Sequence, residues 1–354
     1  MSRRTLAGIL AVPMLIALWV TAVLVPLPYV TYSPGITVDV LGETSDGEII
    51  EVSGHQAYRD EGQLRMTTVY VTQPEGKVNL FEAVGAWLSR TDAVYPREAV
   101  YAPEETRESS RMQSAVQMVS SQDAAVAVAL RELGYPVQEA VEVLNVTDNM
   151  PAQGKLQVGD ELLRVGGRDI TSAQDVVDAV TDNATAGEPI EFVFKRAGDE
   201  RTEQITPMAV PDEDGTEVLR VGIVPGRGYS FPFDVKVNID ESIGGPSAGL
   251  MFSLAIYDTL TEGSLTGEAI VAGTGTIDEE GLVGPIGGIQ QKIVAAQDVG
   301  AELFLVPADN CPDALGARSG DMALVRVQSM HEATEAIESW VGDPTTELPV
   351  CAKE

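Results

Sequence analysis

Histidine is scarce in this chain of 354 residues, and its scarcity excludes several kinds of active site. The only histidines are His55 and His331, and neither stands near a glycine-rich turn. A triad or a metal centre that draws on several histidines therefore cannot be assembled from this sequence. We expect neither a metal nor another cofactor.

The motif that holds nucleotide phosphates is also absent. The two Gly-Lys pairs, Gly76–Lys77 and Gly154–Lys155, lack both the leading glycine and the following hydroxyl residue of that motif. Basic residues are few as well, because 23 of them face 54 acidic ones and leave a formal net charge of −31. Such a charge repels nucleic-acid phosphates. We therefore expect neither nucleotide hydrolysis within these residues nor binding of nucleic acid, and we interpret the acidic excess as a solvated surface.

Charged residues are missing from one long stretch, which runs from Leu6 to about Val30. About 20 helical residues, at ~1.5 Å each, span the ~30 Å hydrocarbon layer of a membrane. The stretch predicts a transmembrane anchor over residues 6–30, with residues 1–5 as a cytoplasmic tip because the two arginines before it favour the cytoplasmic side. The residues after this stretch would then lie outside the cytoplasm, on a chain that crosses the cell membrane once. A cleaved signal peptide is the alternative.

Cysteine occurs only twice, as Cys311 and Cys351. An even pair in a domain outside the cytoplasm is typical of a disulfide. The bond would tie a C-terminal tail, residues 343–354, to the body of the protein. Two free buried thiols are the alternative.

A compact unit is predicted over residues 136–212. It combines a strand at residues 140–146, a turn through Pro151-Ala152, a Gly159-Asp160 pair before an apolar strand, and a helix from Ser172 to Asp182. This order resembles a bacterial PDZ domain. The resemblance implies that a peptide adds as an extra strand beside the helix, through main-chain hydrogen bonds. The alternative is a spacer whose groove is blocked.

A serine that follows a glycine-rich turn is a candidate nucleophile. Ser247 stands after Gly244-Gly245-Pro246, at the predicted start of an apolar helix that runs to about Leu260. Backbone N–H groups converge at such a position and can hold a tetrahedral oxyanion. A simple helix cap is the alternative.

A serine hydroxyl needs a base, and here a lysine is the candidate. Lys292 lies three residues into a predicted apolar helix that begins near Ile289, on the side where Ile293 and Ala296 also point. Loss of hydration there lowers the pKa of the amine toward the range in which it can take a proton from the serine. The alternative is a surface lysine whose stem lies along apolar side chains.

Residues 234–249 and 281–306 together resemble the proteolytic domain of the Lon family. The shared motifs are Gly-Pro-Ser-Ala-Gly around Ser247 and Pro-Ile-Gly-Gly-x-x-x-Lys around Lys292. The resemblance implies that the two residues form a Ser–Lys dyad, with serine as nucleophile and lysine as base. In the family this dyad cleaves peptide bonds through an acyl-enzyme.

The same resemblance assigns supporting residues. The threonine that bonds the family's catalytic lysine falls on Thr274, and Gly245 with Pro246 forms the turn before the nucleophile. Many Lon proteins have Lys-Asp before Gly-Pro-Ser, whereas Ile243-Gly244 stands there in this sequence. The acid of that pair is therefore missing.

Together these parts predict an α+β fold. A Lon-type proteolytic domain, built as a mixed sheet with helices, is formed by residues 31–135 and 213–342, with the PDZ-like β/α unit inserted between them and a transmembrane helix at the amino end. This arrangement resembles the PDZ-containing Lon-like proteases of Gram-positive bacteria, which implies an ATP-independent serine endopeptidase acting on exported or membrane proteins. Peptide or protein substrates are the expected partners, and a homo-oligomer is a further expectation because related Lon domains form rings. The alternatives are a catalytically silent scaffold that tethers a partner, and an amidase or esterase acting on the cell envelope.

Overall fold

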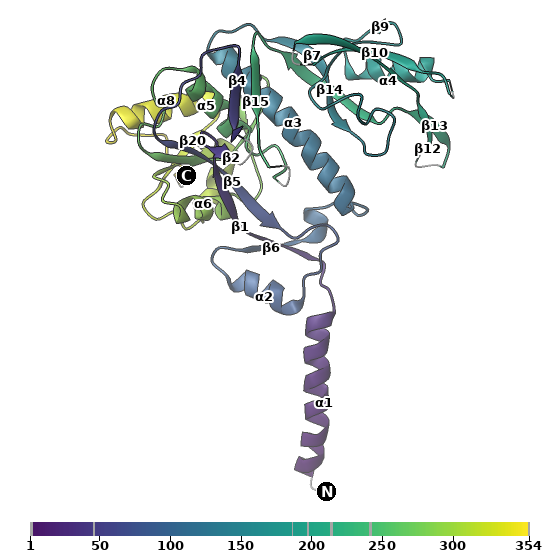
Figure 1. The fold of residues 1–354 in the computed structure, drawn as a ribbon. Helices are drawn as coiled ribbons and strands as arrows, with labels where there is room; N and C mark the ends of the chain where they lie inside the picture. The colour runs from purple at the N-terminus through teal and green to yellow at the C-terminus, as the bar shows by residue number, and fades with distance from the viewer. Residues whose placement is uncertain are drawn as a thin grey trace.

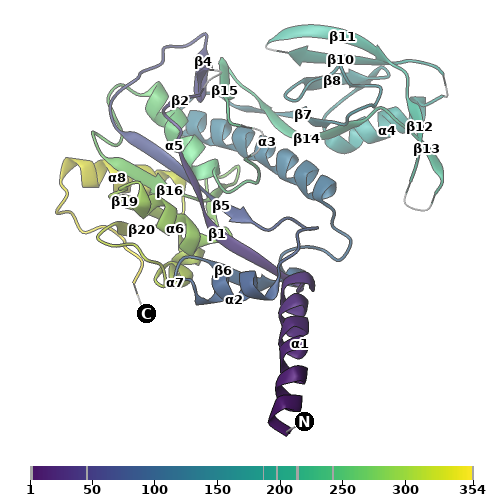
Figure 2. The same ribbon diagram turned by 60° about the horizontal axis from the view of Figure 1, so that its bottom comes forward.

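The computed structural model describes residues 3–44, 47–185, 187–196, 198–212, 215–240 and 243–352. Figures 1 and 2 show two lobes, and a helix, α1 (Arg3–Leu24), that leads away from them. Residues 1 and 2 of the predicted cytoplasmic tip, and residues 353 and 354 of the predicted tail, lie outside the described residues.

The larger lobe is built on a mixed sheet, which has six strands in the described chain. They are β1 (Tyr29–Asp39), β5 (Gln63–Val71), β6 (Ala93–Pro96), β16 (Ile270–Gly273), β19 (Leu303–Pro307) and β20 (Ala323–Val327). Their order is β20-β19-β16-β5-β1-β6. Strands β5, β16, β19 and β20 run parallel, whereas β1 is antiparallel to both of its neighbours. The mixed α+β class predicted from the sequence is confirmed.

Helices cover both faces of this sheet. The helices of the larger lobe are α2 (Leu80–Leu88), α3 (Arg107–Glu132), α5 (Gly249–Leu260), α6 (Ile289–Asp298), α7 (Cys311–Ala314) and α8 (Met330–Gly342), with short 3₁₀ helices η1 (Arg97–Ala99) and η2 (Ala308–Asn310). Leu303 and Leu305 of β19 lie in one core with α5. The residues that alternate with them, Phe304 and Val306, lie in a second core with α6. A strand buried on both faces is apolar throughout, which explains the unbroken apolar run of β19.

Helix α3 begins earlier than its apolar spacing predicts. The spacing suggests a start near Met112, but a capping box between Thr106 and Ser109 starts the helix at Arg107. Buried side chains begin only at Met118. Apolar periodicity reports the part of a helix that packs against a core, so the solvated first turns of α3 give no such signal.

The smaller lobe is an antiparallel sheet with one helix. Its elements are β7 (Gln138–Val146), β8 (Glu161–Val165), β9 (Arg168–Asp169), β10 (Ile190–Arg196), β11 (Asp199–Ile205), β14 (Ile223–Ser230) and α4 (Ala173–Asn183). The strand order is β11-β10-β8-β7-β14, with β9 beside β8. Phe192 and Phe194 are fully buried beneath α4, which a capping box between Ser172 and Asp175 starts. The lobe therefore has a core of its own.

Strand β14 extends the smaller lobe past the predicted end of the PDZ-like unit at residue 212. It pairs with β7 along its whole length, from Ile223 opposite Val146 to Ser230 opposite Gln138. The sheet of the smaller lobe thus takes in residues that the sequence assigns to the catalytic part. The domain boundaries themselves stay a prediction.

Among the described residues, four short two-stranded antiparallel sheets complete the fold. They are β2 (Glu43–Thr44) with β3 (Gly47–Glu48), β4 (Ile50–Ser53) with β15 (Asp234–Val237), β12 (Met208–Pro211) with β13 (Glu217–Arg220), and β17 (Thr276–Ile277) with β18 (Val283–Gly284). The β4–β15 pair joins a segment before the smaller lobe to one after it. Where the chain crosses between the lobes, Tyr135 and Phe233 pack edge to face, and His55 stacks on Phe233 with ring centroids 4.4 Å apart.

The predicted transmembrane anchor over residues 6–30 is not supported. Helix α1 ends at Leu24, and among the helices of the described residues none is both long enough and apolar enough to cross a membrane. The helix stops there because Pro26 and Pro28 disfavour helical conformation in the residues before them. Residues 25–28 form a connection, and β1 begins at Tyr29.

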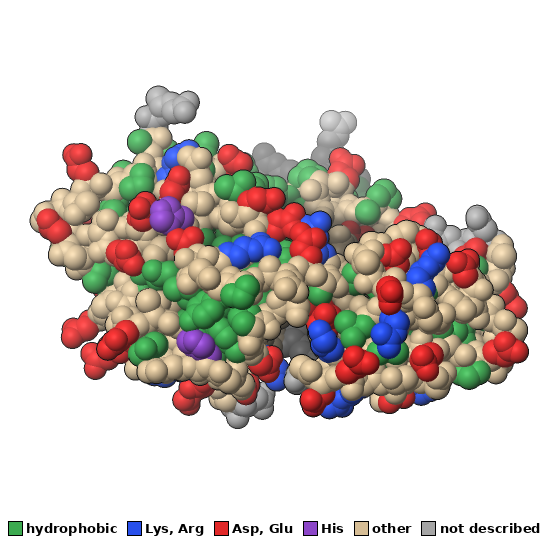
Figure 3. Space-filling model, turned by 90° about the horizontal axis from the view of Figure 1, so that it is seen from above, with side chains coloured by type: hydrophobic (Ala, Val, Ile, Leu, Met, Phe, Trp, Pro, Cys, Tyr) green, Lys and Arg blue, Asp and Glu red, His purple; other side chains and the backbone are tan. Residues whose placement is uncertain are grey.

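Acidic side chains are spread over the surface. Figure 3 shows them on both lobes of the face it presents, with lysine and arginine among them. Several of the basic side chains form ion pairs, as Arg59 does with Glu48 and Arg318 with Asp298. This distribution agrees with the interpretation of the acidic excess as a solvated surface.

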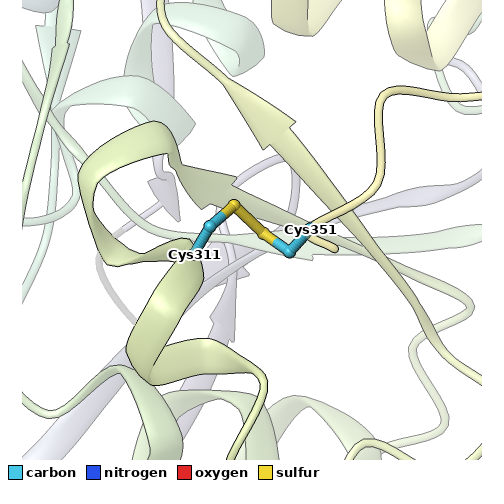
Figure 4. The surroundings of a disulfide bond; sticks show 2 residues. All are labelled: Cys311 and Cys351. Atoms are coloured by element: carbon cyan, nitrogen blue, oxygen red, sulfur yellow. A yellow bond between two sulfur atoms is a disulfide. The ribbon is translucent and has the colours of Figure 1, made fainter. Parts of the chain in front are cut away.

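A disulfide joins Cys311 to Cys351 (Figure 4). Cys311 begins α7, and the segment around Cys351 lies along β20, where Arg326 N–H donates to the carbonyl of Pro349 and Cys351 N–H donates to that of Leu324. Both cysteines are buried. The bond therefore fastens the end of the described chain to the larger lobe.

Replacing Cys351 with serine should lower the free energy of unfolding by about 2–4 kcal/mol, because the bond closes a loop with a sequence separation of 40 residues and so limits the unfolded chain. Urea unfolding followed by circular dichroism measures this difference. Reductant should lower the stability of the unmodified protein to that of the variant and leave the variant unchanged. Equal unfolding midpoints with and without reductant would show that the bond does not stabilise the fold.

Candidate active site

The turn that carries Ser247 lies between β15 and α5. Gly245 has φ +89°, a conformation that glycine adopts without strain, and its N–H donates to the carbonyl of Ser114 on α3. Ser247 is half-buried in this turn. Helix α5 begins at Gly249 with Ala248 as its N-cap, so Ser247 lies two residues before the helix rather than at its start as the sequence suggests.

Lys292 lies in the first turn of α6. Ile289, Ile293 and Ala296 share its buried side of the helix, as the sequence predicts, and only 2% of Lys292 is exposed. An amine without hydration is less stable in its charged form. Burial accordingly lowers the pKa of the Lys292 amine from its ordinary value to about 7.

The structure brings Ser247, Lys292 and Thr274 into one hydrogen-bonded group. Lys292 Nζ lies 2.8 Å from Ser247 Oγ. It also donates to Thr274 Oγ1 at 2.8 Å, and that hydroxyl in turn donates to the backbone carbonyl of Ser247 at 2.9 Å. A threonine hydroxyl has a single hydrogen. Since the carbonyl of Ser247 takes it, Thr274 can only accept from the lysine.

Backbone donors lie beside the serine hydroxyl. The N–H groups of Ser247 and Ala248 donate to no acceptor among the described residues. Donors of this kind at the start of a helix are suited to hold an oxyanion. The turn therefore carries the Ser247 hydroxyl and unused backbone donors within two residues.

The two histidines take no part in this group. His55 stacks on Phe233, and His331 bonds to Glu132 on the surface. In the part of the chain that the structure describes, no three His, Cys, Asp or Glu side chains gather where they could hold a metal.

Sequence reasoning missed the contribution of α3. Ser114 accepts the N–H of Gly245, and the hydroxyl of Ser121 donates to the carbonyl of Pro246 at 3.1 Å. Serines within a helix are usually solvated, and nothing in their spacing indicates which distant turn they contact. These two contacts follow only from the packing of α3 against α5, which brings the serines beside the turn.

Two family models match the chain. The model of the C-terminal proteolytic domain of Lon protease (S16) matches residues 237–336, which include Ser247, Thr274 and Lys292, and the model of the PDZ domain matches residues 114–206. The chain contains a PDZ domain and a Lon-type proteolytic domain. The serine peptidase class expected from the sequence is supported by the Lon-type match.

Curated Lon proteases resemble the Lon-type domain. Lon protease 2 of Bacillus subtilis is 32% identical over 119 residues, which cover 33% of this chain and 21% of that protein. Lon protease 1 of Herpetosiphon aurantiacus is 32% identical over 136 residues, which cover 38% and 16%. The chain thus spans no more than 21% of the length of these relatives.

Among solved structures, the PDZ domain of an SdrC-like protein from Listeria monocytogenes is 26% identical to this chain. The likeness covers 24% of this chain and 86% of that one, with a TM-score of 0.21.

The amine of Lys292 should titrate near pH 7 in the folded protein, because burial disfavours its charged form. Nuclear magnetic resonance of lysine labelled at the carbon beside the amine measures this value, and Lys292→Met assigns the signal. Unfolding in urea should return the midpoint to the ordinary value of about 10.4. A signal that titrates near that value in the folded protein would contradict the dehydrated environment.

Proposed function

We propose that this protein is a serine endopeptidase in which Ser247 attacks the peptide carbonyl and Lys292 acts as its base. The observation that carries the proposal is the 2.8 Å contact between the serine hydroxyl and a buried amine. A hydroxyl is a weak nucleophile until an adjacent base takes its proton. An amine with a pKa of about 7 is neutral in a large fraction of molecules at physiological pH, so it can serve as that base.

Thr274 orients the lone pair of the base. A neutral amine has two hydrogens and one lone pair, and Thr274 accepts one of the hydrogens. The lone pair is then free to accept the hydroxyl hydrogen of Ser247, 2.8 Å away. The Thr274 hydroxyl also holds the backbone of the nucleophile through the Ser247 carbonyl.

The reaction proceeds by acyl transfer. Ser247 Oγ bonds to the substrate carbonyl carbon as its proton passes to Lys292, and the N–H groups of Ser247 and Ala248 stabilise the resulting oxyanion. The tetrahedral species collapses when Lys292 returns the proton to the departing amine, which leaves an ester on Ser247. Water, deprotonated by Lys292, then attacks the ester. This attack forms a second tetrahedral species. It collapses as Lys292 returns the proton to Ser247 Oγ, which releases the carboxylic acid and restores the serine.

Substrates are proposed to be exposed or unfolded segments of exported or membrane proteins. No nucleotide-binding motif occurs in these residues, so the peptidase is proposed to act without ATP and to depend on segments that are already accessible. The disulfide supports a catalytic part that lies outside the cytoplasm, since such bonds persist in oxidising compartments. A homo-oligomer stays a prediction from the Lon resemblance.

Hydrolysis of fluorescently labelled casein without nucleotide tests the proposal. Ser247→Ala and Lys292→Met should each reduce kcat by roughly a thousandfold or more, because dyad residues act as a unit. Lys236→Met, which removes a half-exposed lysine elsewhere, should leave kcat close to that of the unmodified protein. The rate should rise with pH through about 7 and then level off, because the amine is protonated below its pKa and neutral above it.

Other outcomes identify the alternatives. Binding of casein without cleavage in the unmodified protein would contradict the peptidase and favour a silent scaffold. Cleavage of small esters but of no peptide would favour the amidase or esterase. A rate that is independent of pH between 6 and 8 would contradict Lys292 as the base.

The PDZ domain is proposed to deliver peptide substrates along β14. This strand ends the sheet, so one of its edges is unpaired in the described chain. Ile223, at its start, packs with the core that contains Val176 and Val180 of α4. A strand edge beside a helix is where a PDZ domain adds a peptide through main-chain hydrogen bonds. The expected groove beside helix 172–182 is thus proposed to run along the first half of β14.

Hydrogen exchange with casein bound to Ser247→Ala tests this groove, since that variant should bind without cutting. The amides of Ile223, Val224 and Gly226 on β14 should exchange more slowly, because strand addition gives this edge new hydrogen bonds. Amides of α4 should also exchange more slowly, because the bound peptide would lie against that helix. Ser247→Ala without casein is the control. Protection confined to residues outside β14 and α4 would place the peptide elsewhere.

A further inference from the structure

Helix α3 lies against the turn that carries Ser247, between β15 and α5. Ser114 and Ser121 are seven residues apart, which is close to two turns of an α-helix, so they lie on one side of it. The carbonyl of Ser114 accepts from the N–H of Gly245, and the hydroxyl of Ser121 donates to the carbonyl of Pro246. These two groups of the turn flank the peptide bond between Gly245 and Pro246. Helix α3 thus fixes the turn from a segment far earlier in the sequence.

The turn approaches α3 closely at Ser121. Only 4% of Ser121 is exposed, and its hydroxyl donates to the carbonyl of Pro246 at 3.1 Å. A Cβ on Gly249 would lie 2.7 Å from Ser121 Oγ and 2.8 Å from a methyl group of Ile277. The second glycine of Gly-Pro-Ser-Ala-Gly is therefore required for this contact.

The direction of the Ser247 N–H follows from the orientation of the Pro246 carbonyl. This carbonyl accepts from the Ser121 hydroxyl at 3.1 Å and from the Gly249 N–H at 3.3 Å. The C=O and N–H of a trans peptide point in opposite directions and move as one plane. Anchoring the Pro246 carbonyl on Ser121 therefore directs the Ser247 N–H away from α3. The same peptide plane sets where the Ser247 side chain leaves the backbone.

We propose that Ser121 is a positioning residue for the nucleophile: by holding the Pro246 carbonyl it fixes the Ser247 N–H as an oxyanion donor and keeps the hydroxyl in reach of Lys292. This inference rests on the peptidase function proposed above. It gives α3 a part in the site, although no residue of α3 touches the reacting atoms.

Two isosteric variants isolate the hydroxyl. Ser121→Thr keeps it, whereas Ser121→Val replaces it with a methyl group of the same shape, so both add the same volume beside Gly249. We expect kcat for casein to be roughly tenfold or more lower in Ser121→Val than in Ser121→Thr, because small displacements of a reacting group slow the chemical step. KM should be similar in the two variants, since substrate binding does not use this bond.

A second pair controls for loss of stability. Ser253, buried on α5, donates its hydroxyl to the carbonyl of Leu250 at 2.8 Å, so Ser253→Ala removes a bond of the same kind away from the turn. Ser121→Ala and Ser253→Ala should shift the melting temperature by similar amounts. Only Ser121→Ala should lose kcat.

The outcomes separate this inference from the proposed function. An unmodified protein that cleaves casein, together with equal kcat for Ser121→Thr and Ser121→Val, would overturn the role of Ser121 and leave the peptidase intact. Equal loss of kcat in Ser121→Ala and Ser253→Ala would also overturn it, because the effect would then reflect stability alone. An unmodified protein without peptidase activity would overturn both proposals.

Discussion

The site depends on one contact, that of the buried Lys292 amine with the Ser247 hydroxyl. Burial deprives the amine of water, and no carboxylate among the described residues forms an ion pair with it, so its neutral form is favoured. A hydroxyl beside a neutral amine has a base within reach, whereas the same hydroxyl beside an ammonium has none. Dehydration of a single side chain therefore underlies the proposed chemistry.

The mixed sheet brings the members of this contact together. Thr274 follows β16 directly, Lys292 lies on α6 on one face of the sheet, and Ser247 precedes α5 on the other. The Thr274 N–H is held by the carbonyl of Leu305 on the neighbouring strand β19. Because each segment is fixed by the sheet or by a helix packed on it, their side chains meet at hydrogen-bonding distance.

The two lobes share structural elements near the site. Helix α3 packs against α5 in the larger lobe and against β7 and β14 in the smaller one, where Arg131 lies over the ring of Tyr229. The chain also runs directly from β14 through β15 to the turn of Ser247. The proposed peptide edge and the proposed nucleophile are therefore connected both along the chain and through α3.

Local chemistry marked Ser247 and Lys292 as candidates in the sequence, and the Lon resemblance joined them into a dyad and added Thr274. Ser247 follows a glycine-rich turn, Lys292 interrupts an apolar helix, and Thr274 follows from the Lon resemblance; the structure places all three together. Strand β14 was not predicted, because Pro225 and the glycines beside it are residue types that strands seldom contain. An edge strand tolerates proline and glycine, but the pairing that places β14 at the edge of its sheet is long-range, so the local sequence does not reveal it. The contacts of α3 depend on long-range packing in the same way.

Covalent labelling tests the central claim most directly. A serine-directed electrophile is added to the unmodified protein, and mass spectrometry of the digested protein locates the label. The account predicts a label on Ser247 that is lost in Lys292→Met and kept in Lys236→Met. Labelling of Ser247 to an equal extent in Lys292→Met would show that the buried amine does not activate the hydroxyl.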